Sequence, residues 1–236
     1  MLNIKRLGFV IVFFSCFFLS KASFAQKTNQ FDANKKRIGV WKKYYPNKNI
    51  RYQGQFKDGK EVGVFKYYDI SDSRFPIIIQ EFNEENDSVA VSFYSISGKK
   101  QSEGIFINKK RVGKWVYYFD KDNTMSTEFY TDGKLNGKVI NYYPNGKPTE
   151  ITNYKMGVKE GLSQKFSSAG ILIEEVYYKN DKENGIAKYF ELNGNLKETG
   201  VYKNGKRIGE WEFYLDGEIS DKEELEKENN YKKSKN

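Results

Sequence analysis

Carboxylates and aromatic rings are the side chains of this sequence best able to react or to bind a ligand. The 236 residues include 31 acids, 18 tyrosines, 18 phenylalanines and three tryptophans, but no histidine and a single cysteine. Histidine is the commonest general base and metal ligand near neutral pH. There is also no nucleophile elbow, phosphate-binding loop or cluster of metal ligands.

Paired acids such as Glu84-Glu85 and Glu174-Glu175 are the remaining candidates for acid–base chemistry. Neighbours in a strand point to opposite faces, so such pairs need not meet. We therefore expect solvated charges. The sequence predicts a protein that is not an enzyme, with no catalytic residue, no cofactor and no metal.

The aromatic residues belong to a repeat with a period of 24 residues. A glycine marks each unit, and Ser88 takes the marker place in one degenerate copy that is a residue longer on each side. The marker glycines are Gly39, Gly63, Gly113, Gly137, Gly161, Gly185 and Gly209. Five residues after each marker stands an aromatic residue that we expect to be structural: Tyr44, Tyr68, Phe93, Tyr118, Tyr142, Phe166, Phe190 and Tyr214.

Each unit has the pattern of a β-hairpin. Turn pairs lie four residues before a marker, at Asp58-Gly59, Asp132-Gly133 and Asn204-Gly205, and suit the positive φ angles of a tight turn. A second set closes the other end of the hairpins: Asn145-Gly146, Ala169-Gly170, Asn193-Gly194 and Asp216-Gly217. The marker glycine itself indicates a bulge, a bend or a close approach by a ring, and the pattern does not decide among them.

These units predict an all-β fold, an elongated and twisted antiparallel sheet of about eight tandem hairpins, with a compact closed barrel as the alternative. Rings stacked from hairpin to hairpin would form continuous ladders that hold the array together. One strand face carries rings two and four residues after the marker, and we take these rings as the candidate binding surface. They are Trp41, Trp115, Trp211, Tyr67, Tyr117 and Tyr189.

The two ends of the chain differ from the repeat. Residues 1–25 have the basic start, the apolar run and the small-x-small ending of a cleaved signal peptide, so we expect an exported, periplasmic or extracellular protein. Cys16 leaves a lipoprotein as a lesser alternative. Residues 26–217 form the repeat domain, and 218–236 are a charged tail without enough apolar surface to fold alone. Cleavage would lower the formal net charge from +9 to +6.

One stretch departs from the repeat. Residues 69–87 hold Pro76, which cannot donate to a strand ladder, so we expect an edge or an extended loop there. This stretch is either a decayed repeat or a surface modified for a special task.

The strings NGKRIGEWEFY (204–214), GKWVYYF (113–119) and NGKVINYYPNGK (136–147) resemble the MORN-repeat variant, the form found in bacterial proteins grouped with an antitoxin family. The resemblance covers about residues 31–217. It implies an interaction or membrane-associating scaffold without catalytic residues, and the antitoxin grouping implies a partner that is neutralised.

Three functions remain open at this point. The first is an exported scaffold that binds an unknown protein partner at the cell envelope. The second is a glycan or cell-wall module that uses the aromatic rows, and the third is peripheral contact with anionic membranes through scattered lysines. Nucleic acid is not expected, because no dense basic block is present.

Overall fold

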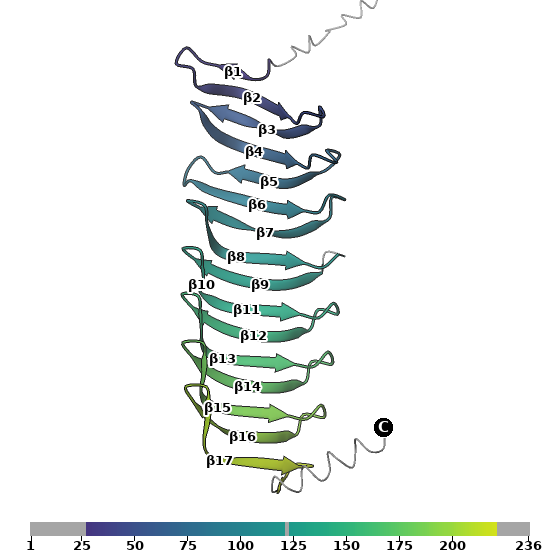
Figure 1. Ribbon diagram of the computed structural model, residues 1–236, viewed down its shortest axis with the longest axis vertical. Helices are drawn as coiled ribbons and strands as arrows, with labels where there is room; N and C mark the ends of the chain where they lie inside the picture. The colour runs from purple at the N-terminus through teal and green to yellow at the C-terminus, as the bar shows by residue number, and fades with distance from the viewer. Residues whose placement is uncertain (1–26, 121–122, 221–236) are drawn as a thin grey trace, which may run out of the picture.

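The computed structural model describes residues 27–120 and 123–220, which form one 18-stranded sheet. Successive strands pair antiparallel along the chain, except that the short β10 and β11 both pair with β9, and β11 then pairs with β12. The first and last strands lie at opposite ends of the stack, so the sheet is open (Figure 1). The predicted elongated sheet of tandem hairpins is confirmed, and the closed alternative is not the one adopted.

The strands of the described residues are β1 Gln30–Phe31, β2 Arg37–Tyr44, β3 Ile50–Lys57, β4 Lys60–Tyr68, β5 Pro76–Phe82, β6 Ser88–Tyr94, β7 Lys100–Ile107, β8 Lys110–Tyr118, β9 Thr124–Thr131, β10 Lys134–Leu135, β11 Gly137–Tyr142, β12 Pro148–Lys155, β13 Val158–Phe166, β14 Leu172–Lys179, β15 Lys182–Phe190, β16 Leu196–Lys203, β17 Lys206–Leu215 and β18 Glu218–Ser220.

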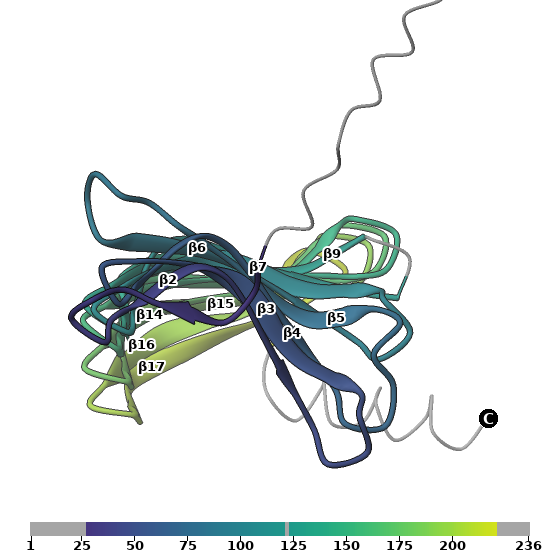
Figure 2. The ribbon, with the colours of Figure 1, turned by 90° about the horizontal axis from the view of Figure 1, so that it is seen from above.

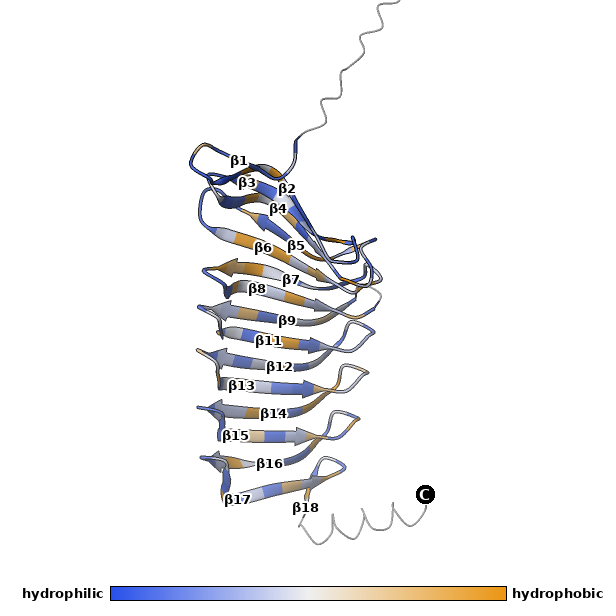
Figure 3. Ribbon diagram, turned by 45° about the horizontal axis from the view of Figure 1, so that its top comes forward, coloured by the Kyte–Doolittle hydropathy of each residue, from blue (hydrophilic) through white to orange (hydrophobic). Residues whose placement is uncertain are grey.

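The strands form a single twisted layer. Seen along the stack, they fan out as the right-handed twist accumulates from hairpin to hairpin (Figure 2). Short apolar segments alternate with hydrophilic ones along the strands from one end of the sheet to the other (Figure 3). Stability therefore comes from neighbouring strands and not from a second layer packed on the first.

Tight turns join the strands at one side of the sheet. At Asp58-Gly59 both residues have positive φ, +51° and +83°, and Asn204-Gly205 has +51° and +79°. These are the angles of a type I′ turn, which asparagine, aspartate and glycine accommodate best. The predicted turns are confirmed, and Met156-Gly157 adopts the same angles, +51° and +97°, with a less suitable first residue.

The marker glycines all have positive φ, from +63° at Gly63 to +125° at Gly137 and Gly185. The pairing of the preceding strand shifts opposite several of them; for example, Gln53 faces Lys66 while Gln55 faces Val62. A Cβ added at Gly63 would meet no atom within 4 Å. The bulge is therefore correct, and at Gly63 glycine is required for its backbone angle and not for lack of space. At Gly137 and Gly185 an added Cβ would also lie 3.1 Å from the Phe129 Cβ and 3.0 Å from the Tyr177 Cβ, so an aromatic residue approaches closely there.

The degenerate copy is offset by one residue from the sequence interpretation. Every marker glycine except Gly209 pairs with an aromatic residue of the next strand, as Gly63 does with Phe82, and the residue that pairs in this way with Phe106 is Val89. Ser88 is thus not the marker. Consequently Phe93 lies four residues after the marker, and Tyr94 takes the place five residues after it.

Hydrogen bonds between turns 22 to 24 residues apart tie successive hairpins together. At one side, the Gly59 amide donates to the Arg37 carbonyl at 3.0 Å, and the Gly205 amide donates to the Glu183 carbonyl at 2.9 Å. At the other side, the Tyr45 hydroxyl donates to the Tyr68 carbonyl at 3.0 Å. The sequence pattern predicts that ring contacts alone hold successive hairpins together, and these hydrogen bonds are a second stabilising interaction between them.

The ends of the array differ from the prediction at both termini. The sequence pattern predicts residues 31–38 as the closing strand of an incomplete first unit. They do not form one strand, because Asp32 Oδ1 accepts from the Asn34 and Lys36 amides and closes a turn after β1. Strand β18 lies beyond the predicted boundary at Gly217, because the Asp216-Gly217 turn folds it back onto β17. The predicted signal peptide and the rest of the tail lie outside the described residues.

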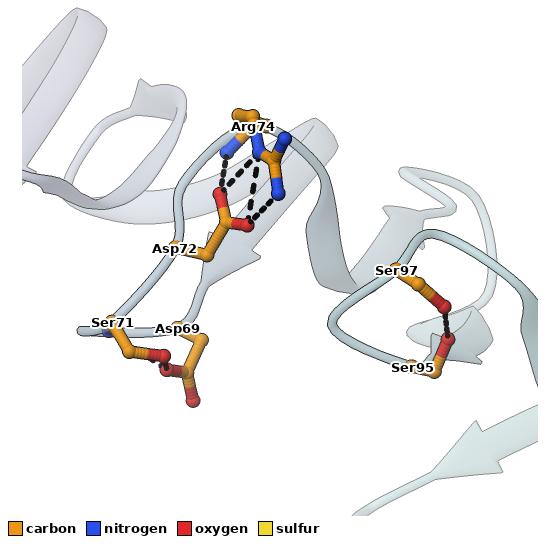
Figure 4. A network of polar contacts seen from close by, with 6 residues as sticks. All are labelled: Asp69, Ser71, Asp72, Arg74, Ser95 and Ser97. Carbon is orange, nitrogen blue, oxygen red and sulfur yellow. Dashed lines mark hydrogen bonds and ion pairs between the residues drawn. The ribbon is translucent and has the colours of Figure 1, made fainter.

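The first part of the irregular stretch, residues 69–75, forms a loop before β5. Arg74 forms a bidentate ion pair with Asp72 at 2.7–3.1 Å, and Ser71 donates to Asp69 from its amide and its hydroxyl (Figure 4). The Ser71 hydrogen bonds hold the pKa of Asp69 below its usual value. The predicted extended loop is present, but it ends before Pro76, which begins β5. The alternative of an edge is wrong, because β5 pairs with β4 and with β6.

Candidate functional site

One face of the sheet, here called the inner face, carries the residues two places after each marker. Counted with Val89 as a marker, they form one row across the stack: Trp41, Phe65, Val91, Trp115, Val139, Ser163, Ala187 and Trp211. Phe65, Trp115 and Ala187 are fully buried, and Val91 and Ser163 are 2% exposed. This row is the closest feature to a core in a single-layer sheet.

Three glycines make room for the large rings of this row. A Cβ added at Gly104 would lie 2.3 Å from the Trp115 ring, and one added at Gly200 would lie 2.2 Å from Trp211. Gly54 has the same relation to Phe65, at 2.4 Å. Real Cβ atoms do not approach other atoms so closely, so each ring lies directly over the backbone of the preceding strand.

Sequence reasoning missed these three glycines, although a signal existed. Each stands 11 residues before its ring, whereas the smaller members Ser163 and Ala187 are preceded at that distance by Thr152 and Val176. Large and small residues therefore alternate across neighbouring strands to fill one volume.

An arginine lies against the ring of each tryptophan. The three units have the form Arg-x-Gly-x-Trp, and the guanidinium lies 5.0 Å from the ring centroid at Arg37, 4.5 Å at Arg111 and 4.0 Å at Arg207. Arg207 also forms an ion pair with Glu198. These cation–π contacts occupy the indole surface on which a sugar would stack.

The tyrosines four places after the marker are half-buried on the same face. Burial, followed by the nearby Glu61 carboxylate, raises the pKa of Tyr67 to about 12. Burial also raises the pKa of Tyr117 and of Tyr189, whose hydroxyl lies 3.3 Å from that of Tyr202. At neutral pH these phenols are neutral hydrogen-bonding groups and not nucleophiles or bases.

The structure brings the six predicted binding residues onto one face but does not leave them all accessible. Trp115 has no exposed surface, so its place on a binding surface is corrected to a place in the core. The physical reason is its neighbours: Gly104 lies beneath the indole, Arg111 lies above it, and Phe106 packs edge-on with centroids 5.0 Å apart. The other five residues are partly exposed: Trp41, Trp211, Tyr67, Tyr117 and Tyr189.

The predicted continuous ladders of rings are wrong. Ring contacts on the inner face fall into groups around Trp41 and Phe65, around Trp115, and around Trp211. Small residues interrupt the row between the last two groups. The rings five places after the marker lie on every second strand, and the residue opposite them on the strand between is not aromatic. For example, Tyr142 pairs with Pro148, so these rings cannot form a ladder. Tyr44 among them is 53% exposed.

The opposite face, here called the outer face, carries an apolar stripe over β14–β17 that sequence reasoning missed. Ile186 pairs with Val201, and Val201 pairs with Ile208 on the next strand. The exposed fractions are 42% for Tyr177, 52% for Ile186, 39% for Val201 and 42% for Ile208. The sequence signal for this stripe is the apolar residue one place after a marker, such as Ile186, together with its partner on the next strand. This signal is weaker than the aromatic pattern.

A hollow beside the β3–β4 turn offers no chemical site. Its volume is about 1000 Å³, and its lining includes Arg37, Glu61, Glu84 and Lys109. Burial raises the pKa of Glu61, against the opposing effect of Arg37. The charges are mixed, and in residues 27–120 and 123–220 no group of three or more His, Cys, Asp or Glu residues could hold a metal ion.

The fold defines an open array of β-hairpin repeats whose hairpins share one register. The family model of the MORN repeat variant matches residues 37–58, 135–156, 159–180 and 183–204. The chain is therefore a MORN-repeat protein. Each matched segment begins two residues before a marker glycine and ends near the next tight turn, so the structural unit and the family unit coincide.

MORN repeats are in general non-catalytic modules that bind proteins or membranes. No curated protein matches the chain. In the part of the chain that the structure describes, no helix is long and apolar enough to cross a membrane.

Proposed function

We propose that this chain is a non-enzymatic scaffold that is exported to the cell envelope and binds a protein partner through its outer face. The observation that carries the proposal is the stripe of Tyr177, Ile186, Val201 and Ile208, apolar side chains that are each about two-fifths to one-half exposed. A contiguous exposed apolar patch on a soluble protein marks an interaction site, whereas scattered apolar residues do not. The signal-peptide pattern of residues 1–25 supports export.

A protein partner fits this surface better than a glycan does. Glycan recognition in repeat arrays needs open aromatic faces, but Arg37, Arg111 and Arg207 cover the three indoles and Trp115 is buried. The outer stripe instead presents aliphatic side chains and one tyrosine on a rigid sheet. Apolar anchors on a pre-organised surface are typical of protein interfaces.

The test is affinity capture from native envelope extracts with the immobilised chain, followed by reconstitution of the complex from purified components. Ile186→Asp places a charge in the centre of the stripe and should abolish both capture and reconstitution. Lys188→Ala is the matched control, because Lys188 lies on the same face of the same strand and outside the stripe. Equal recovery with wild type and Ile186→Asp, or recovery of no defined protein, would contradict the proposal.

A further inference from the structure

Two of the three Arg-x-Gly-x-Trp units hold a second ring that comes from the following strand. Arg37 lies 5.0 Å from the Trp41 ring and 5.1 Å from that of Phe56 on β3. The two rings pack edge-on with centroids 5.7 Å apart. The arginine thus covers a pair of rings, one from its own strand and one from the next.

The second unit repeats this arrangement. Arg111 lies 4.5 Å from the Trp115 ring and 5.4 Å from that of Tyr130 on β9, and the rings pack edge-on at 6.3 Å. In both units the second ring belongs to the residue that pairs with the marker glycine, Gly39 with Phe56 and Gly113 with Tyr130.

The third unit holds its tryptophan and arginine but lacks the following ring. Arg207 lies 4.0 Å from Trp211, and Tyr202 of the preceding strand packs edge-on at 5.1 Å. Beyond β17, the sheet continues within the described residues only as β18, which pairs with Phe213–Leu215. In β15 the pairing with the following strand begins at the marker Gly185. Within residues 27–120 and 123–220, the equivalent stretch Gly209–Glu212 of β17 has no such neighbour.

The repeat also specifies the backbone of the missing neighbour. The carbonyl two residues before a marker accepts a hydrogen bond from the amide of the next turn, as the Arg37 carbonyl does from Gly59 and the Arg111 carbonyl does from Gly133, both at 3.0 Å. A strand that extends the array is therefore antiparallel to β17, places an aromatic residue opposite Gly209, and then turns toward the Arg207 carbonyl.

We propose that the outer edge of β17 binds an extended segment of a partner protein, with a phenylalanine or tyrosine of that segment opposite Gly209. The ring would pack edge-on against Trp211 beneath Arg207, as Phe56 does against Trp41. Main-chain hydrogen bonds along an exposed sheet edge supply affinity, and the ring position supplies specificity. This inference rests on the proposed protein-binding function and identifies a surface distinct from the outer-face stripe.

The probe is a fluorescent synthetic peptide with the sequence of Ile50–Gly59, the segment that completes the first unit. Fluorescence anisotropy with the purified full chain should give saturable binding. The peptide variant Phe56→Ala and the protein variant Arg207→Ala should each weaken binding at least tenfold. Arg37→Ala is the matched control in the protein, because its ring position is already filled by the chain's own Phe56, and it should bind the peptide as wild type does.

The proposal would be overturned by no binding, by equal binding by the Arg207→Ala protein, or by binding only after deletion of residues 221–236, which would assign the edge to the chain's own tail. A dimer in analytical ultracentrifugation that the peptide does not dissociate would assign the edge to a second copy and would also overturn it. If Ile186→Asp abolishes capture of a partner and Arg207→Ala does not, the outer-face binding function is supported and the edge site is not.

Discussion

The pairing of Gly104 with Trp115 gives the sharpest test of how the array is packed. Trp115→Ala removes a fully buried ring, and truncations of this size cost about 3–5 kcal/mol. Gly104→Val inserts atoms where a Cβ alone would lie 2.3 Å from the indole, and overpacking of this kind costs about 1–3 kcal/mol or more. Each single variant should therefore lower the free energy of unfolding.

The double variant should recover part of the loss. Gly104→Val with Trp115→Ala recreates the pair Val176 and Ala187, which the same sheet already uses at the equivalent positions and buries to 1% and 0% exposure. Residues in direct contact have coupling energies of about 0.5–3 kcal/mol in double-mutant cycles. We expect the double variant to be more stable, by an amount in that range, than the sum of the single effects predicts.

Urea unfolding followed by far-ultraviolet circular dichroism measures all four proteins without depending on tryptophan fluorescence. The matched control combines Trp115→Ala with Gly200→Val, whose ring partner is Trp211 and not Trp115, so these two changes should be additive. Equal coupling in the two cycles, or additivity in both, would refute the volume-matching explanation of the inner row.

Three further predictions concern other parts of the array. Arg111→Ala should lower the free energy of unfolding by about 0.5–2 kcal/mol through loss of its cation–π contacts, whereas Lys114→Ala should change it little in the same urea titration. Burial, followed by Glu183, raises the pKa of Tyr178 to about 12. The stabilisation by the neutral phenol is therefore complete below pH 10 and is lost as the pH rises toward 12. The free energies of unfolding at pH 9 and pH 11.5 should differ less for Tyr178→Phe than for wild type. Met156→Asn should stabilise the protein by about 0.5–2 kcal/mol, because asparagine tolerates the φ of +51° at that turn position, and an unchanged melting temperature would contradict this.

The sequence predicts the architecture well because the repeat consists of residues with strong preferences for particular backbone conformations. Asp58-Gly59 and Asn204-Gly205 favour tight turns through their own backbone angles, and alternating aromatic residues favour strands. Spacing alone places the marker of the degenerate copy at Ser88, one residue before its position in the structure. Phe82 stands seven residues before Val89, at the distance found in the other units, and this signal would have corrected the register.

The candidate site was predicted less well, because accessibility depends on neighbours that the repeat pattern does not name. Trp115 and Trp211 occupy the same place in the repeat, yet one is fully buried and the other is partly exposed. The difference arises from the strands on either side, since β9 supplies Tyr130 beside Trp115.

The sequence by itself determined the hairpins, their 24-residue period, the tight turns and, in the regular units, the face on which each ring lies, because these features depend on residues close together in the chain. Only the tertiary structure decided which rings are covered, which glycines make room for them and which edge and face remain available. Those properties depend on contacts between neighbouring hairpins, where a ring from one strand, a glycine from the strand before it and a ring from the strand after it compete for the same volume.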